Sequence, residues 1–163
     1  MSPIAYGIPE VLSQWLIALG AAVVALLITE AVFRIGERIV RRAVRHSAMA
    51  VTVTQSARAP ALWAMRLVAL NLVWQGAPNT LPGLPGVQHW TGMLLIAVIT
   101  WLAVRCVNGV SKAVIASHPV TVADNLMARR IQTQTRAISK TVVGLIVLVG
   151  TALAVTDGRI VAV

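Results

Sequence analysis

Long apolar segments alternate with shorter polar segments along the whole chain. This pattern predicts four membrane-crossing helices, because a bilayer core of ~30 Å needs about 20 helical residues. The predicted spans cover residues 11–33, 60–76, 90–110 and 138–156. They make residues 1–163 one all-α transmembrane domain, and we expect it to fold as an integral membrane helical bundle.

The second span is the weakest of the four. It contains Arg66 and is closed by Gly76 and Pro78. An arginine at a helix centre costs ~2.5–3.5 kcal/mol on insertion scales. Arg66 lies near the start of this span, so its long side chain can reach the inner headgroups. A helix that is tilted, or that lies partly in the membrane interface, remains an alternative to a full crossing.

The connector between the second and third spans is rich in turn-forming residues. Residues 76–90 include three prolines and three glycines, and no arginine, lysine, aspartate or glutamate. Proline and glycine at this density end helices and form turns. The connector is therefore predicted to be a tight hairpin on the outer side of the membrane.

Arginine and lysine are concentrated in two other segments. Residues 34–59 carry six arginines, and residues 105–140 carry six arginines and lysines. Cytoplasmic loops accumulate Lys and Arg. This rule places the connecting segments 34–59 and 111–137 on the cytoplasmic side of a bacterial inner (plasma) membrane. Four spans then place both termini in the periplasm. The N-terminus lacks the positive region of a signal peptide, so we expect the first span to be retained.

Within these two segments the cations follow a helical spacing. Arg34 begins a series at i, i+4, i+7 and i+11, and the second segment repeats it from Arg129 with Thr133 at one position. Such positions share one face of a helix. We therefore expect cytoplasmic amphipathic basic helices that continue the first span and lead into the fourth. The residues predicted to contact lipid headgroups are Arg34, Arg38, Arg41, Arg42, Arg45, Arg129, Arg130, Arg136 and Lys140.

These cationic stripes fit two roles. One is to fix the topology and anchor the chain, because each cation near an anionic membrane surface contributes about 1 kcal/mol. The other is to hold inner-leaflet lipid and transmit bilayer tension. Glu30, the one acidic residue within the first span, lies four residues before Arg34. This order favours a neutralised helical pair near the inner boundary, although an acid within a span is also a candidate functional site.

A bend is expected between the third span and the second basic helix. Pro119 interrupts the preceding helix. Thr121 is followed three residues later by Asp124, which resembles a capping box with aspartate in place of the usual Glu or Gln. We therefore predict a bend at Ser117–Thr121 on the inner face.

The composition supports a membrane protein. Apolar residues make up 58% of the chain and charged residues 12%, against about 45–50% and about 25% in soluble domains. The net charge of +9 lies in separate blocks rather than in one continuous patch, which argues against nucleic-acid binding. Cys106 is the only cysteine, so no intrachain disulfide is possible. We expect its side chain to act as a small, buried apolar group.

Catalytic chemistry has little support in the sequence. The five acidic residues are scattered, and His46, His89 and His118 fall in three different connectors. Paired carboxylates, metal-ligand spacing and a glycine-rich phosphate loop are all missing from the pattern. We therefore expect no enzyme activity, no catalytic residues, no metal or cofactor, and no small-molecule substrate.

One stretch resembles a known family. TVADNLMARRIQTQTRAISKTVVGLIVLVGTALAV, residues 121–155, is similar to the segment before the pore helix in small-conductance mechanosensitive (MscS-type) ion channels. The shared features are T-V-A-D plus a leucine, a basic amphipathic turn, and a span of Val, Ile, Leu and Gly. The family's pore helix and cytoplasmic domain do not follow before Val163.

The resemblance implies a homo-oligomeric channel that opens under membrane tension and protects cells from osmotic stress. On this hypothesis, the chain is the tension-sensing portion of such a channel, with an anionic bilayer as its partner and a separate pore helix beside the fourth span. The alternative hypothesis is a small four-helix membrane protein that serves as a subunit or assembly partner of a larger membrane complex.

Overall fold

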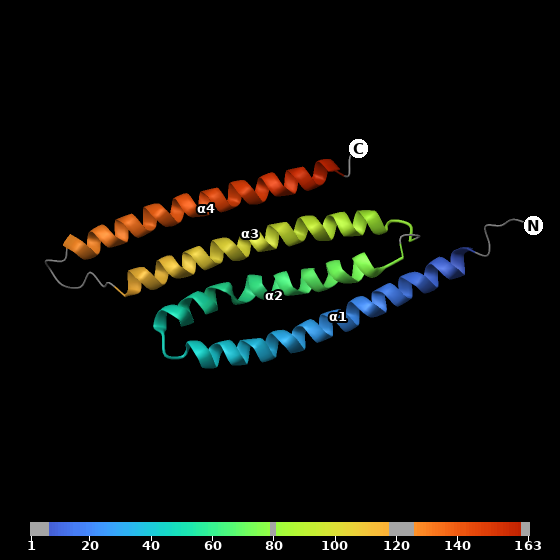
Figure 1. Cartoon of the computed structure of the whole chain (residues 1–163), viewed down its shortest axis with the longest axis horizontal. Helices are drawn as coiled ribbons and strands as arrows, with labels where there is room; N and C mark the ends of the chain where they lie inside the picture. The colour runs from blue at the N-terminus through green and yellow to red at the C-terminus, as the bar shows by residue number, and fades with distance from the viewer. Residues whose placement is uncertain (1–6, 79–80, 118–125, 161–163) are drawn as a thin grey trace, which may run out of the picture.

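The fold consists of long α-helices joined by short connectors (Figure 1). The computed structural model describes residues 7–78, 81–117 and 126–160, and describes side chains within 11–78, 81–117 and 130–156. Its helices are α1 (Gly7–Val44), α2 (Ala48–Gly76), α3 (Leu84–Ala116) and α4 (Leu126–Ile160). The prediction of an all-α fold with four main helices is therefore confirmed.

The helices lie side by side in one antiparallel row, in the order of the sequence (Figure 1). Within the described residues, α1 contacts only α2, α2 contacts α1 and α3, and α4 contacts only α3. The accessible surface area is 11526 Å², against roughly 7800 Å² for a compact soluble monomer of this mass. The predicted bundle is thus corrected to a single open layer. The physical reason for the open layer is that lipid solvates apolar side chains. No hydrophobic force therefore brings α4 against α1 to close the row into a bundle.

Three of these helices are long and apolar enough to cross a membrane. They contain the segments Val11–Val44, Leu84–Ala116 and Arg130–Thr156. Their large apolar side chains face outward, with Ile17 72% exposed and Leu148 65% exposed. A soluble protein seldom exposes apolar surface on this scale. By the composition of its helices, the chain is a multi-pass membrane protein.

α2 begins well before the predicted second span. Its N-terminal cap is Ser47, whose hydroxyl oxygen accepts a hydrogen bond from the backbone N–H of Ala50 at 3.3 Å. The helix then continues through Pro60. A proline within a helix removes one backbone hydrogen-bond donor, and the packing of α2 against α1 and α3 outweighs that loss. Segment 34–59 is therefore the end of α1, a tight turn and the first part of α2.

The connector between α2 and α3 packs against both of its neighbours. Gly83 has a φ of 83°, a left-handed conformation that glycine adopts without steric cost. α3 begins directly after it, which is earlier than the predicted start at Trp90. Leu81 and Leu84 are 2% and 1% exposed. The predicted turn between antiparallel helices is confirmed.

These two leucines complete the main apolar core. They pack with Trp74 of α2 and with Ala18 and Ala22 of α1. The small alanine side chains allow α1 to approach α2 closely at this end. The core therefore joins the first two helices and the hairpin, and it includes no described residue of α4.

Two glycines mark close contacts further along the row. A Cβ atom added at Gly109 of α3 would lie 3.1 Å from the Cα atom of Val53 in α2. A Cβ atom added at Gly150 of α4 would overlap the Thr100 side chain of α3, whereas Gly144 faces open space. Glycine thus permits helix contact at both α2–α3 and α3–α4.

The predicted bend after α3 is only partly described. α3 ends at Ala116, and the backbone N–H of Ser117 donates to the carbonyl oxygen of Ala113. The capping box proposed at Thr121 and Asp124 lies outside the described residues. Cys106 is half-buried on α3, so the buried position expected for it is reached in part.

Candidate functional site

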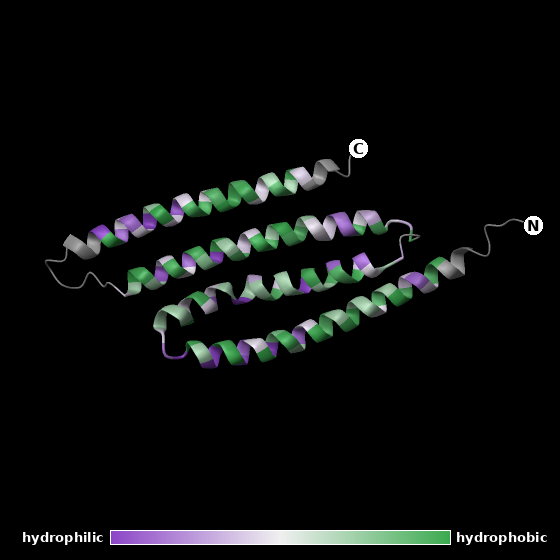
Figure 2. Ribbon diagram, in the orientation of Figure 1, coloured by the Kyte–Doolittle hydropathy of each residue, from purple (hydrophilic) through white to green (hydrophobic). Residues whose placement is uncertain are grey.

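The antiparallel row brings the basic ends of the helices together. The last turns of α1 and α3 and the first turns of α2 and α4 lie at the same end of the layer (Figure 1), and Figure 2 shows hydrophilic residues gathered there on α1 and α4. We call this the basic end, formed by residues 34–58, 108–116 and 130–140. Its described cationic side chains are Arg34, Arg38, Arg41, Arg42, Arg45, Arg58, Lys112, Arg130, Arg136 and Lys140.

Glu37 of α1 joins two arginines at this end. Its Oε1 atom lies 2.6 Å from Nη2 of Arg41, one turn later in the same helix. Arg58 of α2 approaches as a fork, with Nε at 2.8 Å from Oε1 and Nη2 at 3.0 Å from Oε2. Bidentate arginine–carboxylate pairs fix geometry as well as charge. Glu37 therefore connects α1 to α2 and orients both arginines.

Glu30 makes a second link of the same kind, deeper in the layer. Its Oε1 atom lies 3.2 Å from Nε of Arg34, and its Oε2 atom lies 2.8 Å from Nη2 of Arg66 in α2. The guanidinium of Arg66 also lies over the ring of Trp63, 5.4 Å from its centroid. The Glu30–Arg34 pair expected from the sequence is confirmed. The interhelical partner, Arg66, was not foreseen.

The α3–α4 half of the layer has no such compensation. Its described side chains include no aspartate or glutamate. The guanidinium of Arg105 lies over Trp101, 5.8 Å from the ring centroid, which is a cation–π arrangement. The cations of this half are Arg105, Lys112, Arg130, Arg136 and Lys140, and none forms an ion pair with a described residue. Among the described side chains, positive charge is therefore partly neutralised by two glutamates in α1–α2 and is not paired with a carboxylate in α3–α4.

The depressions at the basic end include a groove and a pocket, each of which lies between two helices. A groove of about 740 Å³ runs between α1 and α2. It has an apolar floor that includes Val40 and Met65, and a polar rim that includes Arg45 and Arg58. A smaller pocket of about 280 Å³ lies between α3 and α4, lined by Asn108, Ser111, Arg136, Ser139, Lys140 and Val143.

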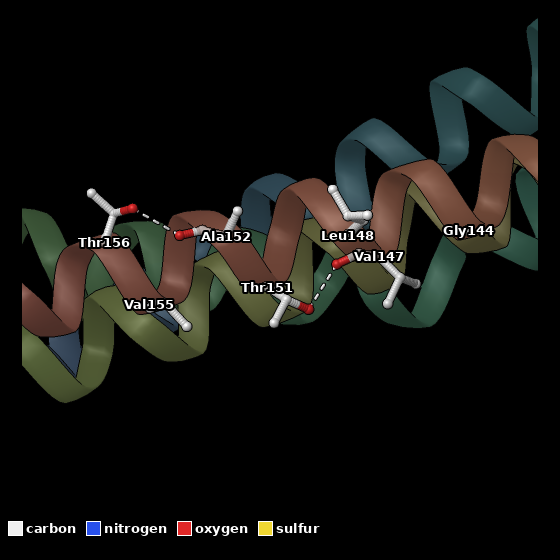
Figure 3. Close-up of a pocket in the computed structure, with 7 residues that line it drawn as sticks. All are labelled: Gly144, Val147, Leu148, Thr151, Ala152, Val155 and Thr156. Atoms are coloured by element: carbon white, nitrogen blue, oxygen red, sulfur yellow. Dashed lines mark hydrogen bonds between the residues drawn. The ribbon is translucent and has the colours of Figure 1, made fainter.

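A third depression is a shallow hollow on the outer face of α4, shown in Figure 3. Its lining residues come from α4 alone and are Gly144, Val147, Leu148, Thr151, Ala152, Val155 and Thr156. The hydroxyl of Thr151 donates to the carbonyl oxygen of Val147 at 2.8 Å, and that of Thr156 donates to Ala152 at 2.9 Å. With both hydroxyls satisfied within the helix, this face behaves as an apolar surface.

The residues predicted to contact headgroups differ in their surroundings. Arg34 and Arg41 are held in ion pairs, whereas Arg38 and Arg42 are exposed on α1. Arg45 lies in the turn after α1, because the helix that carries the first stripe ends one residue before it, at Val44. Arg130, Arg136 and Lys140 are exposed on α4, and the Arg129 side chain lies outside the described set. Their contact with lipid stays a prediction.

The two ion pairs between α1 and α2, Glu30–Arg66 and Glu37–Arg58, could have been found from the spacing of their residues. Glu30 and Glu37 are seven residues apart on α1, while Arg58 and Arg66 are eight apart on α2. These intervals match two turns of a helix, which is the spacing that two ion pairs between antiparallel helices require.

In the described part of the chain, no group of three or more His, Cys, Asp or Glu side chains is placed to hold a metal ion.

The comparisons with known proteins provide no relative from which a function could be transferred. No protein-family model, no curated protein and no solved structure matches this chain.

Proposed function

We propose that this chain is the tension-sensing membrane portion of an MscS-type mechanosensitive channel in a bacterial inner membrane. The observation that carries the proposal is the single open layer, which exposes apolar side chains on both of its faces. A closed bundle shields much of its surface from lipid, whereas this layer contacts lipid along every helix. A change in bilayer tension or thickness therefore acts on each helix directly.

The connections within the layer suggest how the force is transmitted. α1 and α2 are held together at two levels by Glu30 and Glu37, so they move as one unit. α4 contacts only α3 among the described residues, and its outer face remains open to lipid or to another helix. In a channel, the pore helix would lie beside α4 and would follow its displacement.

We include α2 among the spans, which makes four crossings. α2 lies between α1 and α3, so it shares their depth if they cross. Its main obstacle is Arg66, and the ion pair with Glu30 neutralises that charge, which lowers the cost of placing it in the layer. Both termini of the described chain then lie on the periplasmic side, and the basic end lies in the cytoplasm.

This topology predicts a defined labelling pattern. In a Cys106→Ala background, Gly76→Cys, at the exposed end of α2, is expected to react with a membrane-impermeant maleimide added outside intact cells. His46→Cys, exposed in the turn between α1 and α2, is expected to react only after the cells are opened. Outside labelling at both positions, or at neither, contradicts the four-span arrangement.

Channel activity is tested with the complete gene in a bacterium that lacks its own mechanosensitive channels. We expect survival of osmotic downshock and a tension-dependent current in excised membrane patches. The empty vector, expressed in the same strain, is the control. Normal membrane insertion without current or rescue rules out the channel function.

A second candidate function has support from α4. Its outer apolar face contacts no other described helix, as expected for a subunit that docks against a different membrane protein. Purification in mild detergent separates the two hypotheses. A ring of identical subunits supports the channel, whereas stoichiometric co-purification with another membrane protein supports the role of assembly partner.

A further inference from the structure

The pocket between α3 and α4 combines an unusual set of side chains for a membrane protein. Five of its six lining residues are polar or cationic, and none is acidic. Arg136 and Lys140 are one turn apart on α4 and face Asn108 and Ser111 of α3 across the pocket. Two cations, an amide and hydroxyl groups are the donors that bind a phosphate group.

The hydroxyls in this pocket are available as donors. Most Ser and Thr hydroxyls in the described helices bond to a backbone carbonyl one turn earlier, as Thr100 does to Ile96 at 2.8 Å. Ser111 and Ser139 make no such bond within the described chain, although Ser111 is only 8% exposed. Among the described side chains the buried nitrogen or oxygen atom without a partner is Nε1 of Trp74, so the Ser111 hydroxyl is open to the pocket, and a bound anion would accept a hydrogen bond from both serines.

The pocket also lies at the depth of the headgroups. Asn108 and Ser111 are where the predicted third span ends, Arg136 lies just before the predicted fourth span, and Lys140 lies in the first turn of that span. Val143 closes the side toward the apolar part of α4. Headgroup phosphates occupy this level of a bilayer, where Lys and Arg side chains meet them.

We propose that the α3–α4 pocket is a specific site for a phosphate group, with Arg136 and Lys140 supplying charge and Ser111 and Ser139 supplying hydrogen bonds. The phosphate comes either from the headgroup of an anionic inner-leaflet phospholipid or from free inorganic phosphate. The assignment rests on the membrane placement in the proposed function, and it names the ligand that pairs with Arg136 and Lys140.

The site is tested on the purified chain in detergent by native mass spectrometry, with dioctanoyl phosphatidylglycerol as the probe. Arg136→Gln with Lys140→Gln is expected to weaken binding at least about tenfold, because it removes two charge-assisted donors. Ser111→Ala with Ser139→Ala, which leaves the charge unchanged, is expected to weaken it about threefold to tenfold. Circular dichroism confirms that each variant keeps its helical content.

The matched control is Arg105→Gln with Lys112→Gln, which removes two exposed charges of α3 that do not line the pocket and are not among the residues predicted to contact headgroups. This variant is expected to bind almost as the wild type does. Equal weakening by both charge variants, or no effect of the hydroxyl variant, overturns the assignment and indicates diffuse attraction.

Competition by millimolar inorganic phosphate identifies a free anion, and its failure to compete identifies a lipid headgroup; either result supports phosphate chemistry. Since no tension or current is measured, a failed channel assay leaves this test unaffected.

Discussion

Replacing Gly150 by leucine is expected to separate α4 from α3. Even a Cβ atom at this position would overlap the Thr100 side chain, and overpacking of a close contact typically costs about 1–3 kcal/mol. α4 has no other neighbour in the described chain, so no second helix holds it in place. The expected result is a drop of at least about fivefold in the population of the packed α3–α4 pair.

The measurement is cross-linking between Ser111→Cys and Ser139→Cys in a Cys106→Ala background, because these two residues line the same pocket. Gly144→Leu is the control, since it adds the same side chain to α4 where a Cβ atom would meet open space. The control is expected to cross-link as efficiently as the parent. Equal yields for Gly150→Leu and Gly144→Leu would show that the glycine contact does not hold the helices together.

Glu30→Gln is expected to loosen the α1–α2 pair more than any other single charge removal. The change leaves Arg66 without its carboxylate at a site where its side chain is only 32% exposed. An arginine deprived of its partner in this setting is unfavourable. We expect the unfolding equilibrium constant, measured by circular dichroism during titration with sodium dodecyl sulfate, to rise about tenfold.

Three variants test this explanation. Arg66→Gln is expected to have a smaller effect, because Glu30 keeps Arg34 as a partner, and the double variant should regain much of the loss. Glu37→Gln should also be milder, since its arginine partners are 66% and 57% exposed and can be solvated. If Glu37→Gln is as damaging as Glu30→Gln, the position of Arg66 within the layer is not the cause.

The sequence predicts the apolar spans well and their ends poorly. A run of about 20 apolar residues is a strong signal, and it locates the cores of α1, α3 and α4. The ends depend on caps, which are weaker signals. Ser47 starts α2 before the proline that marked the predicted span, and Gly83 starts α3 before Trp90.

The arrangement of the helices was the harder part to predict. Helices that are apolar on most sides do not reveal which neighbours they contact, so the open row could not be distinguished from a bundle. Arg58 and Arg66 look unrelated to Glu37 and Glu30 in the sequence, and only the antiparallel register brings these residues together. The α3–α4 pocket depends on register in the same way.

The strict neighbour-to-neighbour order of the row has a consequence for biosynthesis. Every helix contact described here joins helices that are consecutive in the sequence, so no contact waits for a distant segment to be translated. Chains with such local contacts assemble quickly. Glu30 leaves the ribosome before Arg66, and α1 is therefore already present to receive α2, the helix that is not among the three apolar candidate spans. The layer can be built during translation by adding one helix at a time to its growing edge.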